Sequence, residues 1–400
     1  MLEGWTRSQL GNLGTFHKGK GITKSELCDD GVPCLRYAEI YTTFGDVTSK
    51  LISFVPTESA SDATSIKYGD IIFAASGETA EDIGKAVAFV GRFDAVAGGD
   101  TVILRDHGQD PSFLAHLLNS HSVIKQKSRL GKGQSIVHIH ASDLAGVTVD
   151  LPPLPEQRKI AEILRTWDEA IEKLEALRAA KREQLIGLAQ KLLGIGGVFP
   201  ERWEQRPLSA ISTRVRRQNG GGDHPVMTIS AKSGFRLQSD KFSRDMAGSS
   251  VDRYIVLNEG EFAYNKGNSL TAPYGCIFPL DRPTALVPFV YFCFALNAGM
   301  NREFYAHLFA AGALNHQLSR LINSGVRNDG LLNLDPEDFF GCKVPVPPVE
   351  EQASIAQALT ASKQEVGLLD REIDLLTRQK RGLMQKLLTG EWRVQVEEAA

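Results

Sequence analysis

The sequence predicts an α+β protein with an internal repeat: two mixed α/β domains separated by two long antiparallel coiled-coil helices, related by a pseudo-twofold axis. Three observations predict this class. The segment LPPLPEQRKIAEIL at 151–164 returns as VPPVEEQASIAQAL at 346–359. Each copy opens a stretch in which apolar residues alternate at spacings of four and three, which indicates a coiled-coil helix. Each copy also follows short apolar runs bounded by Gly and Asp, which indicate strands.

Length and composition indicate a multidomain globular protein of a reducing compartment. The 400 residues exceed what one core usually holds, and the 42% hydrophobic and 23% charged fractions are ordinary. No apolar run reaches the roughly 18–20 residues of a membrane span, and the first residues lack the pattern of a signal peptide. Five cysteines without a CxxC pair indicate no disulfide framework. We expect a cytoplasmic location and no membrane partner.

The two copies share seven of their fourteen positions. The identical pairs are Pro152/Pro347, Pro153/Pro348, Glu156/Glu351, Gln157/Gln352, Ile160/Ile355, Ala161/Ala356 and Leu164/Leu359. The repeat extends outward, because QKLL ends both helical stretches and Trp5 matches Trp203. A third repeat start, EWRV, follows the second helical stretch. The predicted ranges are a first domain at 1–150, a first spacer helix at 151–198, a second domain at 199–345, and a second spacer helix with a C-terminal stub at 346–400.

Each helix has a start signal, a seam and a stop signal. A Pro pair followed by a glutamate suits a first helical turn, and Gly194 and Gly390 suit helix ends. About 37 residues predict a helix of roughly 55 Å. The predicted seam consists of Ile160, Leu164, Trp167, Ile171, Leu174, Leu185, Leu188 and Leu192 in the first helix, and of Ile355, Leu359, Val366, Leu369, Ile373, Leu376, Leu383 and Leu387 in the second.

Polar residues interrupt this seam at Arg178 and Lys181 in the first helix and at Ser362 and Lys380 in the second. Two interpretations are open. The long side chains lie along the seam with their charges at its edge, or they select register or partner at some cost in stability.

Chain connectivity favours antiparallel helices. The first helix carries the chain to the second domain, and an antiparallel return buries both seams with the domains at opposite ends. A parallel arrangement needs a connection that doubles back over the whole helix. The antiparallel return also brings the C-terminal EWRV segment to the region of Trp5.

Within the domains, short apolar runs predict strands near 70–76, 86–91, 101–105, 235–239, 261–265 and 275–278. Helical stretches are expected near 111–126 and 288–309.

The sequence contains no recognisable catalytic or metal-binding motif. It has no D/N-P-P-aromatic loop, no GxGxxG, no P-loop and no E-x-K. His138 and His140 lack an evident third ligand, which favours a strand face over a metal site. Ser76 lies in a Ser-Gly-Glu loop without the His and Asp of a nucleophile site. We therefore expect no catalytic residues and no metal ligands.

The doubled P-P-x-x-E-Q-x-x-I-A start of a leucine-rich helix that ends in Q-K-L-L resembles the specificity subunits of type I restriction–modification systems. The GDIIFAASG stretch at 69–77 is similar to the target recognition domains of that family. The likeness covers essentially the whole chain in the order domain, helix, domain, helix.

The resemblance implies a non-catalytic subunit that binds double-stranded DNA. Each target recognition domain then reads half of a split site, and the helices set the spacing and dock two methyltransferase subunits. A restriction and translocation subunit joins through the assembled complex. S-adenosylmethionine, ATP and Mg²⁺ belong to those partners, and this chain holds no cofactor. A stand-alone two-headed DNA-binding regulator and a structural coiled-coil scaffold are the alternatives.

DNA contacts require basic and amide side chains on loops of each domain. The candidates are Lys18, Lys20, Lys24, Arg36, Tyr37, Ser76, Glu78, Lys125, Lys127, Arg129, Lys132 and Gln134 in the first domain, and Arg214, Arg216, Arg217, Lys232, Arg236, Asn265, Lys266, Asn268, Arg327 and Asn328 in the second. Domains ~50 Å apart are expected to contact major grooves one to two helical turns apart, with an unread gap between the half-sites.

Overall fold

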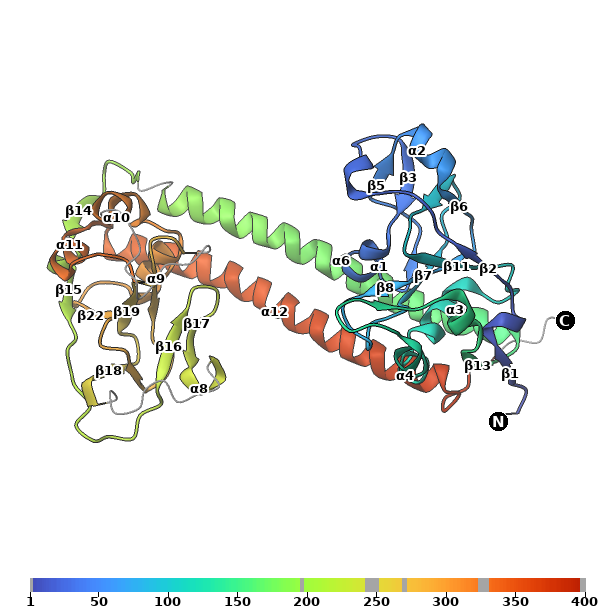
Figure 1. Ribbon diagram of the computed structural model, residues 1–400. Helices are drawn as coiled ribbons and strands as arrows, with labels where there is room; N and C mark the ends of the chain where they lie inside the picture. Colours follow the sequence, from blue (N-terminus) through green and yellow to red (C-terminus); the bar gives the residue numbers. More distant parts are fainter. Residues whose placement is uncertain (1–2, 195–197, 242–251, 268–271, 323–330, 396–400) are drawn as a thin grey trace. The chain divides into compact units, whose positions relative to one another are not determined.

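A computed structural model describes residues 3–194, 198–241, 252–267, 272–322 and 331–395. The chain forms two compact units, Met1–Leu174 with Glu372–Ala400 (unit 1) and Glu175–Arg371 (unit 2). Both boundaries fall inside two continuous helices, α6 (Leu154–Leu193) and α12 (Val349–Leu388), so each unit contains about half of each helix (Figure 1). The α+β class, with two β-rich domains and two long helices packed together, is confirmed. The four predicted domain ranges stay a prediction.

Unit 1 contains thirteen strands among its described residues. They are β1 (Thr6–Gln9), β2 (Thr15–Lys18), β3 (Val32–Leu35), β4 (Val47–Thr48), β5 (Ser53–Val55), β6 (Thr64–Ile66), β7 (Ile71–Ala74), β8 (Ser76–Gly77), β9 (Ala86–Phe89), β10 (Ala95–Ala97), β11 (Thr101–Arg105), β12 (Val137–His138) and β13 (Thr148–Leu151). Its shorter helices are α1 (Tyr37–Thr42), α2 (Thr57–Asp62), α3 (Pro111–Leu118), α4 (His121–Leu130) and α5 (Ala141–Ala145), with 3-10 turns η1 (Leu10–Asn12) and η2 (Lys24–Glu26).

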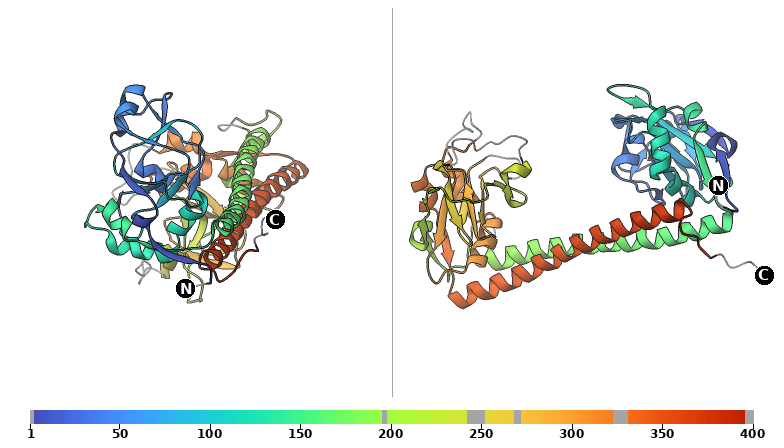
Figure 2. Two further views of the ribbon diagram at one scale, coloured as in Figure 1. Left: turned by 90° about the vertical axis from the view of Figure 1, so that its right-hand side faces the viewer. Right: turned by 90° about the horizontal axis from the view of Figure 1, so that it is seen from below.

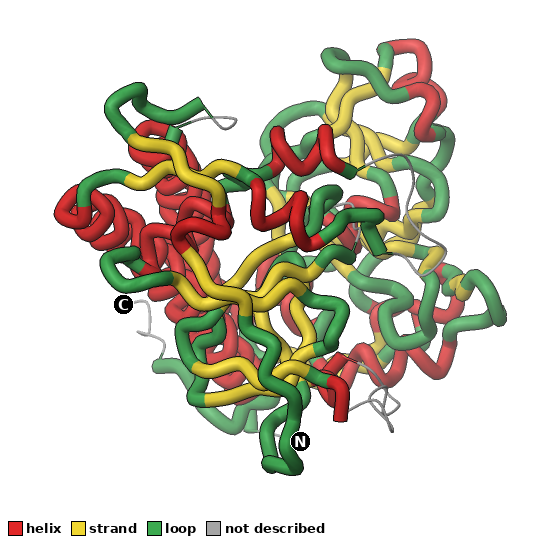
Figure 3. The backbone as a smooth tube through the Cα atoms, turned by 90° about the vertical axis from the view of Figure 1, so that its left-hand side faces the viewer, coloured by secondary structure: helices red, strands yellow, loops and turns green. Residues whose placement is uncertain are grey.

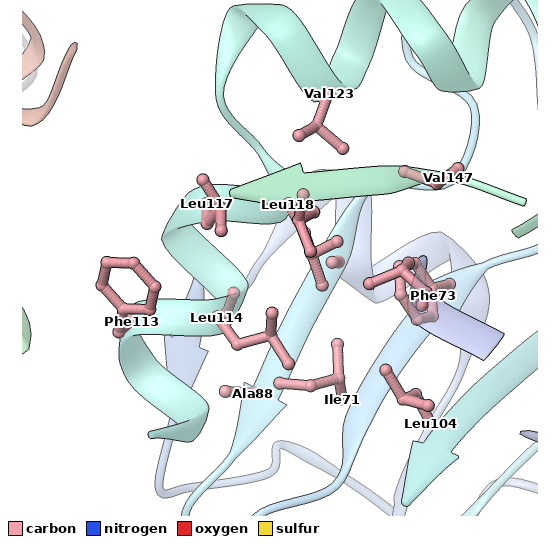
Figure 4. Close-up of a cluster of buried hydrophobic side chains, with 14 of the residues drawn as sticks. Ile71, Phe73, Ala88, Leu104, Phe113, Leu114, Leu117, Leu118, Val123 and Val147 are labelled. Carbon is pink, nitrogen blue, oxygen red and sulfur yellow. The ribbon is translucent and has the colours of Figure 1, made fainter. Parts of the chain in front are cut away.

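These strands form a five-stranded sheet in the order β2-β11-β7-β9-β4, a four-stranded sheet in the order β5-β3-β10-β6, and the pairs β1-β13 and β12-β8. Strand β7 is buried along its whole length because both of its faces are covered. On one face, Ile71 and Phe73 contact a cluster that includes Phe113 and Leu117 of α3 (Figure 4). This double coverage explains the unbroken apolar run at 71–74.

Unit 2 has a smaller sheet system and a helical layer. Its elements are β14 (Glu204–Pro207), α7 (Leu208–Ile211), β15 (Ser212–Arg214), β16 (Met227–Ser230), β17 (Gly234–Leu237), α8 (Gln238–Lys241), β18 (Ile255–Asn258), β19 (Phe262–Asn265), β20 (Cys276–Pro279), β21 (Thr284–Val287), β22 (Phe292–Leu296), α9 (Arg302–Ala310), α10 (Asn315–Leu321), α11 (Pro336–Gly341) and β23 (Lys343–Val346). A four-stranded sheet runs β15-β22-β19-β20, and the other strands form the pairs β14-β23, β16-β17 and β18-β21. Figure 3 shows strands in yellow and helices in red.

The predicted helix at 288–309 is partly wrong, because Phe292–Leu296 forms strand β22 and the helix α9 begins only at Arg302. Strand β22 lies between β15 and β19 in the sheet, and its first three residues are buried. A short apolar run buried on both faces has no periodicity that distinguishes strand from helix. The neighbouring strands therefore decided the conformation of this segment.

The repeated glutamine explains why the helix-start motif occurs twice. Gln157 accepts a hydrogen bond from the backbone N–H of Asp110 (3.0 Å) and donates to the carbonyl of Pro152 (2.9 Å). Gln352 makes the same pair of bonds with Asn301 N–H (2.8 Å) and Pro347 O (2.8 Å). Asp110 and Asn301 are themselves the N-caps of α3 and α9. Gln157 thus anchors α6 to the N-terminus of α3, and Gln352 anchors α12 to the N-terminus of α9.

The repeated glutamate binds an arginine in each unit. Arg393 donates to both carboxylate oxygens of Glu156 at 2.8 and 2.9 Å, and Arg202 donates to Glu351. Arg393 also donates to the carbonyl of Glu3 at 3.1 Å. The predicted return of the EWRV segment to the N-terminal region is therefore confirmed.

Within each unit, the two long helices run antiparallel (Figure 2). In unit 1, the start of α6 packs against the end of α12, because Ile160 and Leu164 share a buried cluster with Leu387. In unit 2, the end of α6 packs against the start of α12, because Leu188 lies against the cluster of Ile355 and Leu359. All sixteen residues of the predicted seam are buried or half-buried.

The charged residues that interrupt the seam form ion pairs with the opposite helix. Lys380 binds Asp168 in unit 1. In unit 2, Arg178 binds Asp370 at 3.2 Å and Lys181 binds Glu365 at 2.8 Å. All three cations are half-buried, so their stems lie along the seam while their charged ends reach its edge. Pairs of this kind contribute little net stability but favour one alignment of the helices.

None of the helices in the described part of the chain combines the length and apolar character that a membrane span needs.

Candidate nucleic-acid interface

Most of the candidate DNA-contacting side chains of unit 1 are exposed. Lys18 ends the edge strand β2, Lys20 follows it and Lys24 begins η2. The other exposed candidates are Glu78, Lys125, Arg129, Lys132 and Gln134. Arg36 and Tyr37 are half-buried, and the guanidinium of Arg36 is bound to Glu39 at 2.9 Å.

The structure brings two separate stretches of the sequence together in unit 1. Strand β8 pairs with β12, placing Ser76 opposite His138, and Lys132 bridges to His138 through backbone hydrogen bonds of 2.8 and 2.9 Å. The loop that carries Glu78 therefore lies beside the loop that carries Lys132 and Gln134. This juxtaposition makes one surface from residues more than 50 positions apart (132 − 78 = 54).

Two of the side chains predicted to contact DNA are buried in unit 1. Ser76 is 3% exposed, and its hydroxyl is hydrogen-bonded to Nδ1 of His138 at 2.8 Å. Lys127 is 1% exposed, and its ammonium donates to the carbonyl of Gly84. Neither side chain is available to a groove. Helical spacing predicts that Lys127 points inward, because Lys127 lies one turn after the apolar Val123, which is buried on α4.

Burial lowers the pKa of Lys127 to about 7 from its ordinary value near 10.5. Between pH 7 and pH 10.5, Lys127 is mostly protonated in the unfolded chain and mostly neutral in the folded chain. The unfolded chain therefore binds up to one proton more, and unfolding becomes less favourable as the pH rises. We expect the stability of the wild type relative to Lys127→Met to increase with pH from about 7 to about 10.5, by at most about 1.4 kcal/mol per pH unit.

Urea unfolding at pH 7 and pH 9 measures this difference. Lys125→Met, on the exposed face of the same helix, controls for the loss of a lysine. A wild type and a Lys127→Met variant with parallel pH profiles would contradict the prediction.

In unit 2, Arg216, Arg217, Lys232 and Arg236 are exposed, whereas Arg214, Asn265 and Lys266 are half-buried. Arg217 is bound to Glu261, and both ends of the Asn265 amide are occupied, by Ile229 O (3.2 Å) and Gly267 N–H (2.9 Å). Asn268, Arg327 and Asn328 lie outside the described residues.

A hollow of about 340 Å³ in unit 2 gathers three of these cations, Arg214, Arg216 and Lys266. Aromatic rings form part of its wall, and Lys266 lies 5.3 Å from the centre of the Phe292 ring. Arg214 lies 5.1 Å from the ring of Phe340. Burial and then the neighbouring charge of Arg216 lower the pKa of Arg214. Like charges held together beside aromatic rings form a site that favours an anion.

Arg253 is a residue that the sequence reasoning missed. Its guanidinium lies 4.8 Å from the ring centre of Phe289, an exposed aromatic residue on the rim of the same hollow. The signal in the sequence was weak, because Arg253 follows an aspartate, Asp252, and has no glycine-flanked loop around it.

The sequence and the fold both have known counterparts. Residues 2–181 match the family described as type I restriction modification DNA specificity domain. The type I restriction enzyme EcoKI specificity subunit of Escherichia coli K12 is 22% identical, with 98% of this chain and 91% of that protein covered. The putative MjaX specificity subunit of Methanocaldococcus jannaschii is 24% identical, with 94% and 90% covered.

Among solved structures, the S subunit of a type I restriction–modification system from M. genitalium has a similar fold. The TM-score is 0.59 at 17% identity, and 96% of each chain is covered. The family match, the two relatives that span nearly the whole chain and this shared fold agree with the doubled helix-start motif. Over nearly its whole length the chain is therefore similar to DNA specificity subunits of type I restriction–modification systems.

Proposed function

We propose that this chain is the non-catalytic subunit that reads a bipartite DNA site for a type I restriction–modification complex. The observation that carries the proposal is the duplication of two features in one chain. Each unit has its own set of exposed basic side chains, and both units share the same two unbroken helices. A protein that reads two half-sites needs two separate binding surfaces joined by a stiff connection.

In unit 1, the proposed DNA surface consists of the strand-edge lysines Lys18 and Lys20 and the joined loops of Glu78 and Lys132. Lysines on the edge suit phosphates, which set position, whereas amide and carboxylate groups on loops suit base edges. Gln134 and Glu78 are therefore the side chains we assign to base contacts. Lys132 forms an ion pair with Asp143 at 3.0 Å. Because this pair is exposed, a phosphate can take the place of Asp143 at small cost.

In unit 2, the hollow formed by Arg214, Arg216 and Lys266 is the proposed site of the DNA backbone. Its cations sit against aromatic walls, where partial burial strengthens their attraction for a phosphate. The exposed Lys232 and Arg236, on or beside the hairpin β16-β17, extend the positive surface.

The helix pair is proposed to set the spacing and to dock two methyltransferase subunits. A helix of 40 residues is about 60 Å long at ~1.5 Å per residue, enough to separate two half-sites by an unread gap. Several large apolar side chains of these helices lie off the seam and are exposed: Leu177, Ile186, Leu368 and Leu375, at 45, 51, 57 and 55%. We propose that these side chains belong to the surface that the methyltransferase subunits cover.

The remaining assignments follow from this role. The restriction and translocation subunits join through the methyltransferase subunits. S-adenosylmethionine, ATP and Mg²⁺ belong to those partners rather than to this chain. A cytoplasmic location, where the chromosome and foreign DNA are both accessible, completes the proposal.

The proposal is tested by co-expressing the chain with candidate methyltransferase subunits and mapping methylated bases on genomic DNA. The expected result is a split motif that appears only when this chain is present. A continuous motif, or a motif independent of this chain, would refute it. Specific DNA binding by the pure chain, with no effect of methyltransferase, would instead favour a stand-alone regulator.

The hollow in unit 2 provides a sharper test. We expect Arg216→Ala to weaken binding of the assembled complex to its DNA about tenfold and to lower the slope of log K against log salt by about 1. Fluorescence anisotropy at several salt concentrations measures both quantities. Arg320→Ala, an exposed arginine on α10, serves as the matched control. Equal effects of the two substitutions would remove the hollow from the interface.

A further inference from the structure

Unit 2 carries a stacked pair of exposed side chains at the rim of its cationic hollow. The guanidinium of Arg253 lies 4.8 Å from the centre of the Phe289 ring. Arg253 is exposed, and Phe289, which is 48% exposed, lines the hollow together with Arg214 and Arg216. A planar guanidinium stacked on a ring has its fork of donors arranged in advance. The pair therefore presents the N–H groups of one arginine in a restricted orientation.

The register of the strand pair β18-β21 explains why Arg253 meets Phe289. In this antiparallel pair, Ile255 lies opposite Val287. Two residues further along, the same register places Arg253 opposite Phe289, where side chains across a pair come into contact. Tyr291 fixes the turn that carries Phe289, because its N–H donates to the carbonyl three residues earlier at 3.0 Å. The tyrosine hydroxyl also accepts a hydrogen bond from a backbone N–H of β16 at 3.2 Å. The position of the ring is thus set by the sheet.

The repeat places Phe289 at the sheet edge that carries the proposed DNA-contacting lysines of unit 1. Strands β7 and β19 begin 191 residues apart (262 − 71 = 191), and so do β11 and β22 (292 − 101 = 191). Gly98 of unit 1 therefore corresponds to Phe289. The next residue, Gly99, donates its N–H to the carbonyl of Gly21 at 2.8 Å, in the loop that carries Lys20. This correspondence is independent of the hollow and also favours a DNA-facing position for Phe289.

The two units differ in what this edge exposes. Gly98 has no side chain, and a Cβ at its position would lie 3.2 Å from the Cβ of Ile22, so the turn in unit 1 is covered. The corresponding turn in unit 2 exposes the ring of Phe289 with Arg253 stacked on it. Contacts to phosphate carry no sequence information directly, whereas side chains that reach base edges do. A pair present in one unit only is therefore suited to reading the half-site of that unit.

The neighbouring cations are placed differently from Arg253. Arg217 is bound to Glu261, and Arg214 is half-buried against the ring of Phe340. Cations held in this way suit a phosphate, which fixes the position of the protein on the duplex. Arg253 is exposed at the rim, and an arginine with two parallel N–H donors matches the O6 and N7 acceptors of guanine.

We propose that Arg253 reads a guanine in the major groove of the half-site bound by unit 2, and that Phe289 is the positioning residue that holds its guanidinium. The inference rests on the proposed function and assigns one base contact within it. Two N–H groups of the guanidinium donate to O6 and N7 of the guanine. Arg214 and Arg216 hold a phosphate of the DNA backbone beside it.

The test uses the complex with methyltransferase subunits and a duplex that contains the split site mapped by methylation. Each guanine of both strands and both half-sites is replaced in turn by 7-deazaguanine, which lacks the N7 acceptor. We expect the wild-type complex to bind about tenfold more weakly when one particular guanine is replaced. Arg253→Ala should bind the unmodified duplex about tenfold more weakly and should be insensitive to replacement of that same guanine.

Three further variants separate base reading from general effects. Arg253→Lys keeps the charge but not the paired donors, so it should behave like Arg253→Ala. Phe289→Ala should reduce the effect of the critical 7-deazaguanine, and Phe289→Tyr, which retains a ring, should restore it. Phe93→Ala, at an exposed phenylalanine of unit 1 outside both proposed DNA surfaces, should leave binding unchanged.

The outcome distinguishes this inference from the proposed function. A split motif that depends on the chain, combined with an Arg253→Ala variant that responds to every 7-deazaguanine as the wild type does, overturns the inference alone. Equal weakening on all duplexes would assign Arg253 to phosphate, and a site without guanine would equally contradict the proposal. If the wild-type complex has no split motif, both the proposed function and the inference are wrong.

Discussion

A complex whose specificity subunit carries seven extra residues in each long helix is expected to stop methylating its native site and to methylate a site with a longer gap. The residues to duplicate are 171–177 in α6 and 370–376 in α12, which face each other within the antiparallel pair. Seven residues are two turns of a coiled coil, so the seam and the outer faces keep their alignment. The helices lengthen by about 10 Å, which corresponds to at most about three base pairs.

Methylome sequencing of cells that express the lengthened subunit measures the new gap. The half-site sequences should stay unchanged, because no residue of either DNA surface is altered. Duplication in α6 alone is the control, since it leaves the two helices unequal and should abolish methylation at both the old and the new site. An unchanged gap in the doubly lengthened subunit would show that the helices do not set the spacing.

Replacement of Leu174 and Leu369 by aspartate is expected to destabilise the helix pair strongly and to abolish assembly with methyltransferase subunits. Both leucines are half-buried in the seam, and each aspartate would place a charge without a partner against apolar side chains. The expected loss is about 3 kcal/mol or more for each substitution. Thermal unfolding of the chain alone and size-exclusion chromatography of the complex measure the two effects.

The neighbouring leucines Leu177 and Leu368 provide matched controls for folding on the same helices. Both are exposed, so Leu177→Asp and Leu368→Asp should leave the melting temperature of the chain within about 2 °C of the wild type. If these two variants still lose methyltransferase binding, the exposed leucines belong to the docking surface. If the seam variants assemble normally, the helix pair is not what the partner recognises.

Local patterns in the sequence were sufficient for the long helices. The Pro pair, the heptad spacing and the terminal glycines predicted elements that the structure places at Leu154–Leu193 and Val349–Leu388. Gly194 and Gly390 have positive φ values of 83° and 69°, the left-handed conformation that favours glycine at a helix end. These signals are local, because each depends on residues within one or two turns.

Local sequence patterns predicted only part of the candidate DNA surface. Charge and flanking glycines identified Arg216 and Lys132, whose side chains are exposed. The same reasoning misplaced Lys127, because a lysine within a charged run looks like a surface residue until its helix is packed against a core. It also missed Arg253, whose guanidinium lies over the ring of Phe289 beside a hollow formed by distant segments.

The sequence by itself determined the repeat, the two helices and the resemblance to specificity subunits, because these are written in short identical motifs and in heptad spacing. Only the tertiary structure decided that Phe292–Leu296 is a strand, that Gln157 and Gln352 hold each helix to its domain, and that Arg253 lies over the ring of Phe289. The physical reason is that burial and hydrogen-bond satisfaction depend on segments far apart in the chain. A local pattern specifies the conformation of a segment, whereas its environment is specified by everything that packs against it.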